Sequence, residues 1–215
     1  MSPLHYLVRH PRVESTNPPL LVLLHGVGSN EEDLFRFEER LPDTNLIISL
    51  RAPYSRGASR YAWYEVDLGK GAPVINAEQA EQSRIAIIHF IEELHSRIPF
   101  DINRIYLCGF SQGGIMSYSV GLTRPDLIRG IAVLSGRLLN EIKPMIVKQQ
   151  KLADLRVFIA HGVQDMVLNH QYARDAEAYL LSLNIHPIVK EYEAGHYIND
   201  GMLNDLNHWL TDPFE

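Results

Sequence analysis

Short runs of successive apolar residues alternate along this chain with segments of helical periodicity, and this alternation limits the fold strongly. The runs lie at Leu20–Leu24, Leu46–Leu50, Ile105–Cys108, Ile131–Leu134, Val157–Ala160 and Ile188–Tyr192. Because most of them are apolar on consecutive residues, they are typical of strands that are covered on both faces of a parallel sheet. The segment Leu4–Val8 is expected to add an edge strand.

The segments between these runs predict helices. The clearest covers about Ala77 to Ile98, where Ile87, Ile91 and Leu94 are spaced for one helical face. Further helices are expected at roughly Glu31–Leu41, Gln112–Leu122, Gln171–Leu183 and Met202–Trp209. This order indicates an α/β fold, with a mostly parallel central sheet of about seven strands and helices on both faces. We expect a single domain over residues 1–215.

Composition and charge fit a globular protein and argue against several other classes. The chain has 215 residues, of which 46% are hydrophobic and 21% charged, and its net charge is −6. Nucleic acid and anionic membranes are disfavoured as main partners, because both attract clustered positive charge. No apolar run approaches the roughly 20 residues of a membrane span, and the N-terminus lacks the pattern of a signal peptide. With Cys108 as the single cysteine, we expect a cytoplasmic protein.

The segment Gly109-Phe-Ser111-Gln-Gly113 has the pattern Gly-x-Ser-x-Gly between a predicted strand and a predicted helix. A nucleophilic serine at such a turn needs small residues two positions away on each side, which the two glycines supply. The N-terminus of the following helix directs its dipole and its free N–H groups toward developing negative charge. The alternative is a glycine-rich turn with an incidental serine.

A serine nucleophile needs a base and an acid that orients the base, and the order in this setting is Ser, Asp or Glu, then His. His196 lies in the loop after the last predicted strand, and Asp165 follows the strand Val157–Ala160. Because loops at the carboxyl ends of parallel strands meet at one edge of the sheet, we expect both side chains near Ser111. Alternatively, Asp165 caps a helix and His196 is an ordinary loop histidine. Four other acids and histidines lie within helices or before strands: Asp154, Asp175, His186 and His208.

The turn His25-Gly-Val27-Gly follows the strand Leu20–Leu24 and is rich in small residues. Such a turn lets backbone N–H groups approach a reacting carbonyl, and we expect the N–H groups of Val27 and Gln112 to form the oxyanion hole. The alternative is an ordinary strand-to-helix turn. Because no second ligand stands two or four residues from His25, the sequence indicates no metal site, and the chemistry requires no cofactor.

Residues Arg51–Pro73 form a long segment without periodicity that is rich in aromatic residues. Loops of this length within compact domains are often functional. We expect Trp63 and Tyr64 to bind the substrate as walls of an acyl pocket. In the alternative, the two aromatic side chains fasten the loop to the core.

Together these motifs resemble the phospholipase/carboxylesterase family of α/β-hydrolases, which contains bacterial carboxylesterases and acyl-protein thioesterases. The resemblance rests on Leu24–Ser29, Asn30–Leu34, Arg51–Pro53, Gly109–Gly114, Leu134–Gly136, His161–Asp165 and Gly195–His196. The string Gly-Phe-Ser-Gln-Gly-Gly is far more specific than Gly-x-Ser-x-Gly, and Asn30–Leu34 is similar to the bacterial branch. The resemblance implies an α/β-hydrolase fold in which Ser111, Asp165 and His196 are catalytic.

The chain also departs from the thioesterase relatives in two places. Ser29 stands where they usually carry an aspartate, and the proline common shortly after the catalytic acid is absent from Met166-Val-Leu168. We therefore predict a serine hydrolase that cleaves small carboxylic esters through an acyl-enzyme. The alternatives are an acyl thioesterase or lysophospholipase with the same triad and, more remotely, a binding protein on a hydrolase scaffold. A homodimer is left open, since the resembled family includes dimers.

Overall fold

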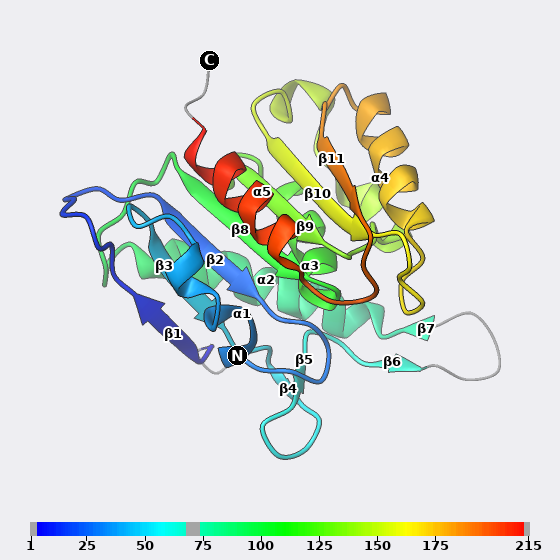
Figure 1. Cartoon of the computed structure of the whole chain (residues 1–215), viewed down its shortest axis with the longest axis horizontal. Helices are drawn as coiled ribbons and strands as arrows, with labels where there is room; N and C mark the ends of the chain where they lie inside the picture. Colours follow the sequence, from blue (N-terminus) through cyan, green and yellow to red (C-terminus); the bar gives the residue numbers. More distant parts are fainter. Residues whose placement is uncertain (1–3, 68–73, 213–215) are drawn as a thin grey trace.

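Seven strands form one twisted sheet at the centre of the computed structural model, which describes residues 4–67 and 74–212 (Figure 1). Their order is β1-β3-β2-β8-β9-β10-β11, and β1 alone runs antiparallel to its neighbour. The predicted mostly parallel sheet is therefore confirmed. The strands are β1 (Tyr6–Arg9), β2 (Leu20–Leu24), β3 (Leu46–Leu50), β8 (Ile105–Phe110), β9 (Gly130–Leu134), β10 (Arg156–Gly162) and β11 (Ile188–Tyr192).

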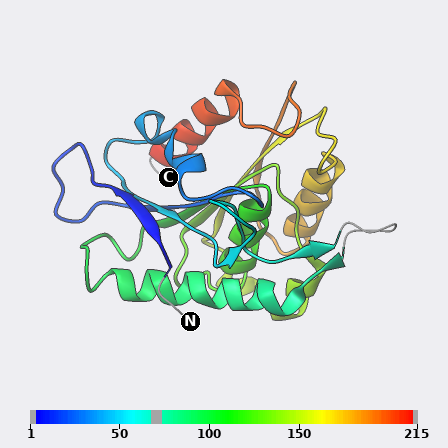
Figure 2. The same cartoon turned by 90° about the horizontal axis from the view of Figure 1, so that it is seen from below.

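Helices cover both faces of the sheet, as Figure 2 shows. On one face, α2 (Ala77–Leu94), α3 (Gln112–Gly121) and α4 (Gln171–Ser182) bury their apolar side chains in a single cluster. On the other face, α1 (Glu32–Phe35) and α5 (Asp200–Thr211) form a smaller cluster around Trp209. Strands β2, β8, β9 and β10 are covered on both sides, which explains their continuous apolar runs. No helix within residues 4–67 and 74–212 is long and apolar enough to cross a bilayer.

Two segments differ from the prediction. The helix expected over Glu31–Leu41 is two short pieces, α1 and the 3₁₀ turn η1 (Glu38–Arg40), because the chain leaves helical geometry at Phe37. The break lets Arg40 reach Asp200 of α5, and it lets Leu41 enter the core. The loop expected over 51–73 contains three short strands, a fourth follows it directly, and residues 68–73 lie outside the described part. The remaining elements are β4 (Tyr54–Ser55), β5 (Tyr61–Ala62), β6 (Val66–Asp67), β7 (Val74–Ile75), η2 (Asn140–Met145) and η3 (Gln149–Lys151).

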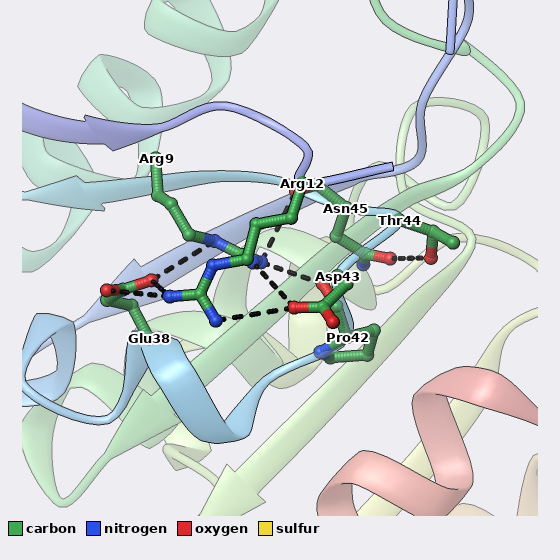
Figure 3. Close-up of polar contacts among 7 residues, drawn as sticks. All are labelled: Arg9, Arg12, Glu38, Pro42, Asp43, Thr44 and Asn45. Carbon is green, nitrogen blue, oxygen red and sulfur yellow. Dashed lines mark hydrogen bonds and ion pairs between the residues drawn. The ribbon is translucent and has the colours of Figure 1, made fainter. Parts of the chain in front are cut away.

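The antiparallel edge strand β1 is held in place by a buried arginine (Figure 3). Arg9 is only 8% exposed, and its Nη2 donates to the carbonyl oxygen of Pro42 at 2.7 Å. The same guanidinium lies 3.4 Å from a carboxylate oxygen of Glu38 and 3.6 Å from one of Asp43. These contacts join β1 to the turn before β3, and they balance the charge that the fold buries there.

Candidate active site

Ser111 lies on a strained turn between β8 and α3. Its φ of 52° is in the left-handed region, which a side chain other than glycine rarely adopts. A Cβ atom at Gly109 would lie 2.2 Å from the carbonyl oxygen of Gly113, and one at Gly113 would lie 1.9 Å from that of Leu24. The expectation that only small residues fit at these two positions is confirmed, since any side chain would collide with backbone.

The three loops that follow β8, β10 and β11 bring Ser111, Asp165 and His196 together. His196 Nε2 lies 3.0 Å from Ser111 Oγ, and His196 Nδ1 lies 2.6 Å from Asp165 Oδ2. Ser111 and Asp165 are buried, and the ring of Phe110 packs 4.9 Å from the His196 ring. The arrangement leaves the imidazole one partner on each nitrogen, so the ring can accept a proton from the hydroxyl while Nδ1–H donates to the carboxylate.

The Asp165 carboxylate is charged and held by backbone groups. Its Oδ1 accepts hydrogen bonds from the N–H groups of Val167 and Leu168, each at 2.8 Å. Burial opposes ionisation, but the hydrogen bonds from His196 and from these two N–H groups outweigh it and lower the pKa of Asp165. A proline at position 167 or 168 would remove one of these donors. Because neither Val167 nor Leu168 is a proline, both N–H groups are available to bind the Asp165 carboxylate.

His161 also contacts the acid, and the sequence analysis did not consider it as a site residue. Its side chain is fully buried, with Nε2 2.8 Å from the Leu168 carbonyl oxygen and 3.3 Å from Asp165 Oδ2. Burial lowers the pKa of His161, so the ring is neutral and Nε2–H is the donor. Within the described residues, Nδ1 has no partner. In the sequence, only the position of His161 could have pointed to this contact, because it stands four residues before Asp165 near the end of β10.

The turn after β2 lies directly against Ser111. A Cβ atom at Gly26 would lie 3.3 Å from the Phe110 ring and 3.5 Å from Ser111 Cβ. In the part of the chain that the structure describes, no hydrogen bond occupies the N–H group of Val27. Gln112 is the first residue of α3, so its N–H group has no partner within the helix. The assignment of these two groups as oxyanion donors stays a prediction.

His25 holds this turn in place from inside the protein. Its Nε2 accepts a hydrogen bond from the Ala52 N–H group at 3.0 Å, and its Nδ1 lies 2.7 Å from the Gly26 carbonyl oxygen. Burial lowers the pKa of His25, which is consistent with a neutral ring that donates from Nδ1. The carbonyl oxygen of His25 accepts from Trp63 Nε1 at 2.9 Å. Both nitrogens are thus used for internal contacts.

Trp63 and Tyr64 are buried in the core cluster, at 0% and 1% exposure. The side chain of Gln112 accepts a hydrogen bond from the Trp63 N–H group and donates one to the Tyr64 carbonyl oxygen, both at 2.8 Å. The Trp63 carbonyl oxygen accepts from Ser83 of α2. These contacts are what the anchoring alternative predicts, and contact of either aromatic ring with substrate stays a prediction.

Cys108 stands three residues before Ser111 and is fully buried in β8. Burial raises the pKa of its thiol to about 12, so the thiol stays protonated near neutral pH. Cys108 therefore serves as a small apolar residue of the core, and Ser111 is the nucleophile candidate at this end of β8.

Known proteins are similar to this chain over most of its length. The family model described as Phospholipase/Carboxylesterase matches residues 7–212. Acyl-protein thioesterase 1 of Neurospora crassa is 28% identical, with 91% of each chain covered. A probable SOBER1-like carboxylesterase of Arabidopsis thaliana is 26% identical, over 88% of this chain and 77% of the relative.

Solved structures show the same fold. The carboxylesterase from Mesorhizobium loti superposes with a TM-score of 0.84 at 21% identity, covering 98% of this chain and 95% of that one. The Bacillus cereus carboxylesterase gives a TM-score of 0.83 at 21% identity, with coverages of 97% and 94%. The predicted α/β-hydrolase fold is confirmed. With a family match over nearly its whole length, the chain belongs to the phospholipase/carboxylesterase family and is a serine hydrolase of the carboxylesterase and acyl-protein thioesterase type.

Proposed function

We propose that the protein hydrolyses carboxylic esters with Ser111 as nucleophile, His196 as general base and Asp165 as the acid that orients the base. The observation that carries the proposal is the unbroken hydrogen-bond chain from Ser111 Oγ through both nitrogens of His196 to Asp165 Oδ2, with distances of 3.0 and 2.6 Å. Each distance lies within reach of a proton transfer.

The reaction proceeds in two halves. His196 Nε2 takes the Ser111 proton while Oγ attacks the ester carbonyl, and the imidazolium then protonates the departing alcohol. Water attacks the resulting acyl-serine, with His196 as base again, and releases the acid. Asp165 fixes the tautomer with the proton on Nδ1, and its charge stabilises the imidazolium. The chemistry requires no cofactor.

The oxyanion of both tetrahedral intermediates is held by the N–H groups of Val27 and Gln112. Support comes from the close approach of Gly26 to Ser111 and from the unoccupied Val27 N–H group in the described chain. The dipole of α3 adds to the positive potential at this point. Loss of one such donor typically costs about 3–4 kcal/mol of transition-state stabilisation.

A thioester or a lysophospholipid is the second candidate substrate, favoured by the similarity to the acyl-protein thioesterase of Neurospora crassa. Initial rates on p-nitrophenyl esters of increasing acyl length separate the two readings. A peak at short chains supports a small-molecule carboxylesterase, and a rise toward long chains supports the lipid or acyl-protein reading.

The single, buried cysteine supports a cytoplasmic location.

The decisive experiment replaces the nucleophile. Ser111→Ala is expected to reduce p-nitrophenyl butyrate hydrolysis to the background rate and to leave the melting temperature near that of the wild type. Ser119→Ala is the matched control, because it removes a buried hydroxyl from α3 that donates to the Ile115 carbonyl oxygen and does not contact His196 in the described chain. A fluorophosphonate probe should label the wild type and Ser119→Ala but not Ser111→Ala. Substantial turnover by Ser111→Ala would refute the triad, and an unlabelled wild type would favour the binding-protein alternative.

A further inference from the structure

A polar groove lies between α4 and the segment that follows β9. Its volume is about 170 Å³, and its lining includes Arg137 and Lys143 on one side and Tyr172 and Tyr179 on the other. Since one water occupies roughly 30 Å³ in the liquid, this volume leaves room for a carboxylate or phosphate group with a short chain. Figure 1 shows α4 beside β10 and β11, at the end of the sheet that carries the candidate site residues Asp165 and His196.

Both cations in the groove are positioned by aromatic rings and lack acidic partners. The guanidinium carbon of Arg137 lies 5.8 Å from the centre of the Tyr172 ring, and Lys143 Nζ lies 4.7 Å from that of Tyr179. Among the described residues, neither cation forms an ion pair. Arg174 on the same helix, by contrast, is paired with Glu191 at 2.8 Å. A cation over a ring face keeps its N–H donors available to a ligand.

The charge of this groove is opposite to that of the chain as a whole. Its lining holds two cations and one carboxylate, Asp175, whereas the protein has a net charge of −6. Asp175 Oδ1 accepts a hydrogen bond from the Gln171 side chain at 2.9 Å, so one of its oxygens is already used. The neutral amide of Asn140 adds a further donor to the lining. The groove therefore offers donors and positive charge to an anion.

The backbone connects the groove to the nucleophile. The Ser111 N–H group donates to the carbonyl oxygen of Leu134, the last residue of β9, at 2.9 Å. Two residues later, the Cα of Gly136 lies 3.4 Å from the position of a Cβ atom at Gly114, in the first turn of α3. Arg137 comes next in the chain. One end of the groove, at Arg137, is thus joined to the turn that carries Ser111.

The other end of the groove lies further along α4. Tyr172 is the second residue of this helix, and Tyr179 is seven residues further along it. Two helical turns span about 10 Å at 1.5 Å per residue. The cations above these two rings are therefore placed along a line that leads away from the nucleophile, with Arg137 nearer to it.

We propose that this groove is an anion subsite, and that the esters which the protein cleaves carry a carboxylate or phosphate group. Arg137 makes the main contact, because its planar guanidinium matches the two oxygens of such a group, and Lys143 adds a second positive charge. The inference rests on the proposed esterase function, since it names the class of ester that this same site accepts.

Two pairs of esters test the subsite, each pair matched in size and differing in charge. The first pair is mono-p-nitrophenyl glutarate and p-nitrophenyl valerate, which place the charge on the acyl side. The second is the butyrate esters of 4-hydroxybenzoate and 4-hydroxybenzamide, which place it on the alcohol side. For the wild type we expect kcat/KM to favour the anionic member of at least one pair by about tenfold or more. Raising the salt from about 0.05 to about 0.5 M should reduce this preference, because exposed charges are screened.

The variants locate the preference. In Arg137→Gln the anionic-to-neutral ratio is expected to fall about tenfold, and in Lys143→Gln by a smaller factor. Lys148→Gln is the matched control, because Lys148 is exposed in the same segment and does not line the groove; it should keep the wild-type ratio. Glutarate and inorganic phosphate, tested as competitive inhibitors of valerate ester hydrolysis, show which anion binds more tightly. A ratio near one in both pairs, or an unchanged ratio in Arg137→Gln, would overturn the subsite. Failure of the esterase function itself would be evident separately, as turnover that survives Ser111→Ala.

Discussion

The side chain of Gln112 joins α3 to the loop at Trp63 and Tyr64 by two hydrogen bonds, and the free energy of unfolding that they contribute can be estimated. Gln112 is 3% exposed, and it satisfies two buried backbone groups, the N–H of Trp63 and the carbonyl of Tyr64. Gln112→Met keeps a similar side-chain volume but removes the amide that binds both backbone groups. Each buried group left without a hydrogen bond costs about 1–3 kcal/mol, so the variant should lose about 2–6 kcal/mol of unfolding free energy.

This loss can be measured by thermal unfolding. For a chain of this size, each 1 kcal/mol lowers the melting temperature by about 2–4 °C, so a mid-range loss of about 4 kcal/mol predicts a fall of about 8–16 °C. Limited proteolysis should also cut the segment 54–67 faster in this variant, because the two hydrogen bonds from Gln112 no longer hold the segment against α3. Gln150→Met, at an exposed position, is the control and should melt with the wild type. A fall of less than about 4 °C for Gln112→Met would refute the reasoning.

Two further predictions concern pH and the edge strand. Burial lowers the pKa values of His25 and His161, so the folded state resists a proton that the unfolded state accepts. Stability should therefore be complete above about pH 6.5 and fall below it, by up to about 1.4 kcal/mol per pH unit for each group. Urea unfolding between about pH 8 and pH 5.5 should show a shallower decline in His161→Gln; equal slopes would contradict this cause. Arg9→Met removes the side-chain donor to the Pro42 carbonyl and leaves Glu38 with Arg12 as its arginine partner, and it should cost about 1–3 kcal/mol in the same assay. A cost near zero would mean that β1 is held by its pairing with β3 alone.

The sheet was predictable from sequence because its strands are covered on both faces. β2, β3 and β11 have the bounds that their apolar runs predict, whereas β8 and β10 extend past their runs by two residues each toward the site. Gly109, His161 and Gly162 among those extra residues are small or polar, so the apolar run ends before them and hydrophobicity alone does not mark them. The helix expected over Glu31–Leu41 was wrong in its middle, where the chain leaves helical geometry at Phe37 and Arg40 contacts α5, a long-range contact that local periodicity does not encode.

The candidate site likewise contains residues that the sequence could identify and residues that it could not. Chain order and strand ends singled out Ser111, Asp165 and His196 as candidates, and the structure places His196 within hydrogen-bond distance of both Ser111 and Asp165. Their catalytic roles stay a proposal. The roles of the Gln112 side chain and of His161 could not be found in this way. Both depend on which atoms face each other across more than one loop, and no local pattern encodes that. For Trp63, the sequence left two interpretations open, a wall of the acyl pocket or an anchor of the loop to the core, and its burial favours the anchor.

The packing of α5 has a consequence for how the protein acquires activity during synthesis. Trp209 lies against Tyr106 of β8 and Phe158 of β10, with ring centres 5.9 and 5.8 Å apart, and its carbonyl accepts a hydrogen bond from Arg156. His196 lies in the segment between β11 and this helix. During synthesis, a chain that has emerged only as far as α3 carries Ser111 without His196. Because a domain generally folds as a unit, the proposed activity would appear only once α5 has packed on the sheet.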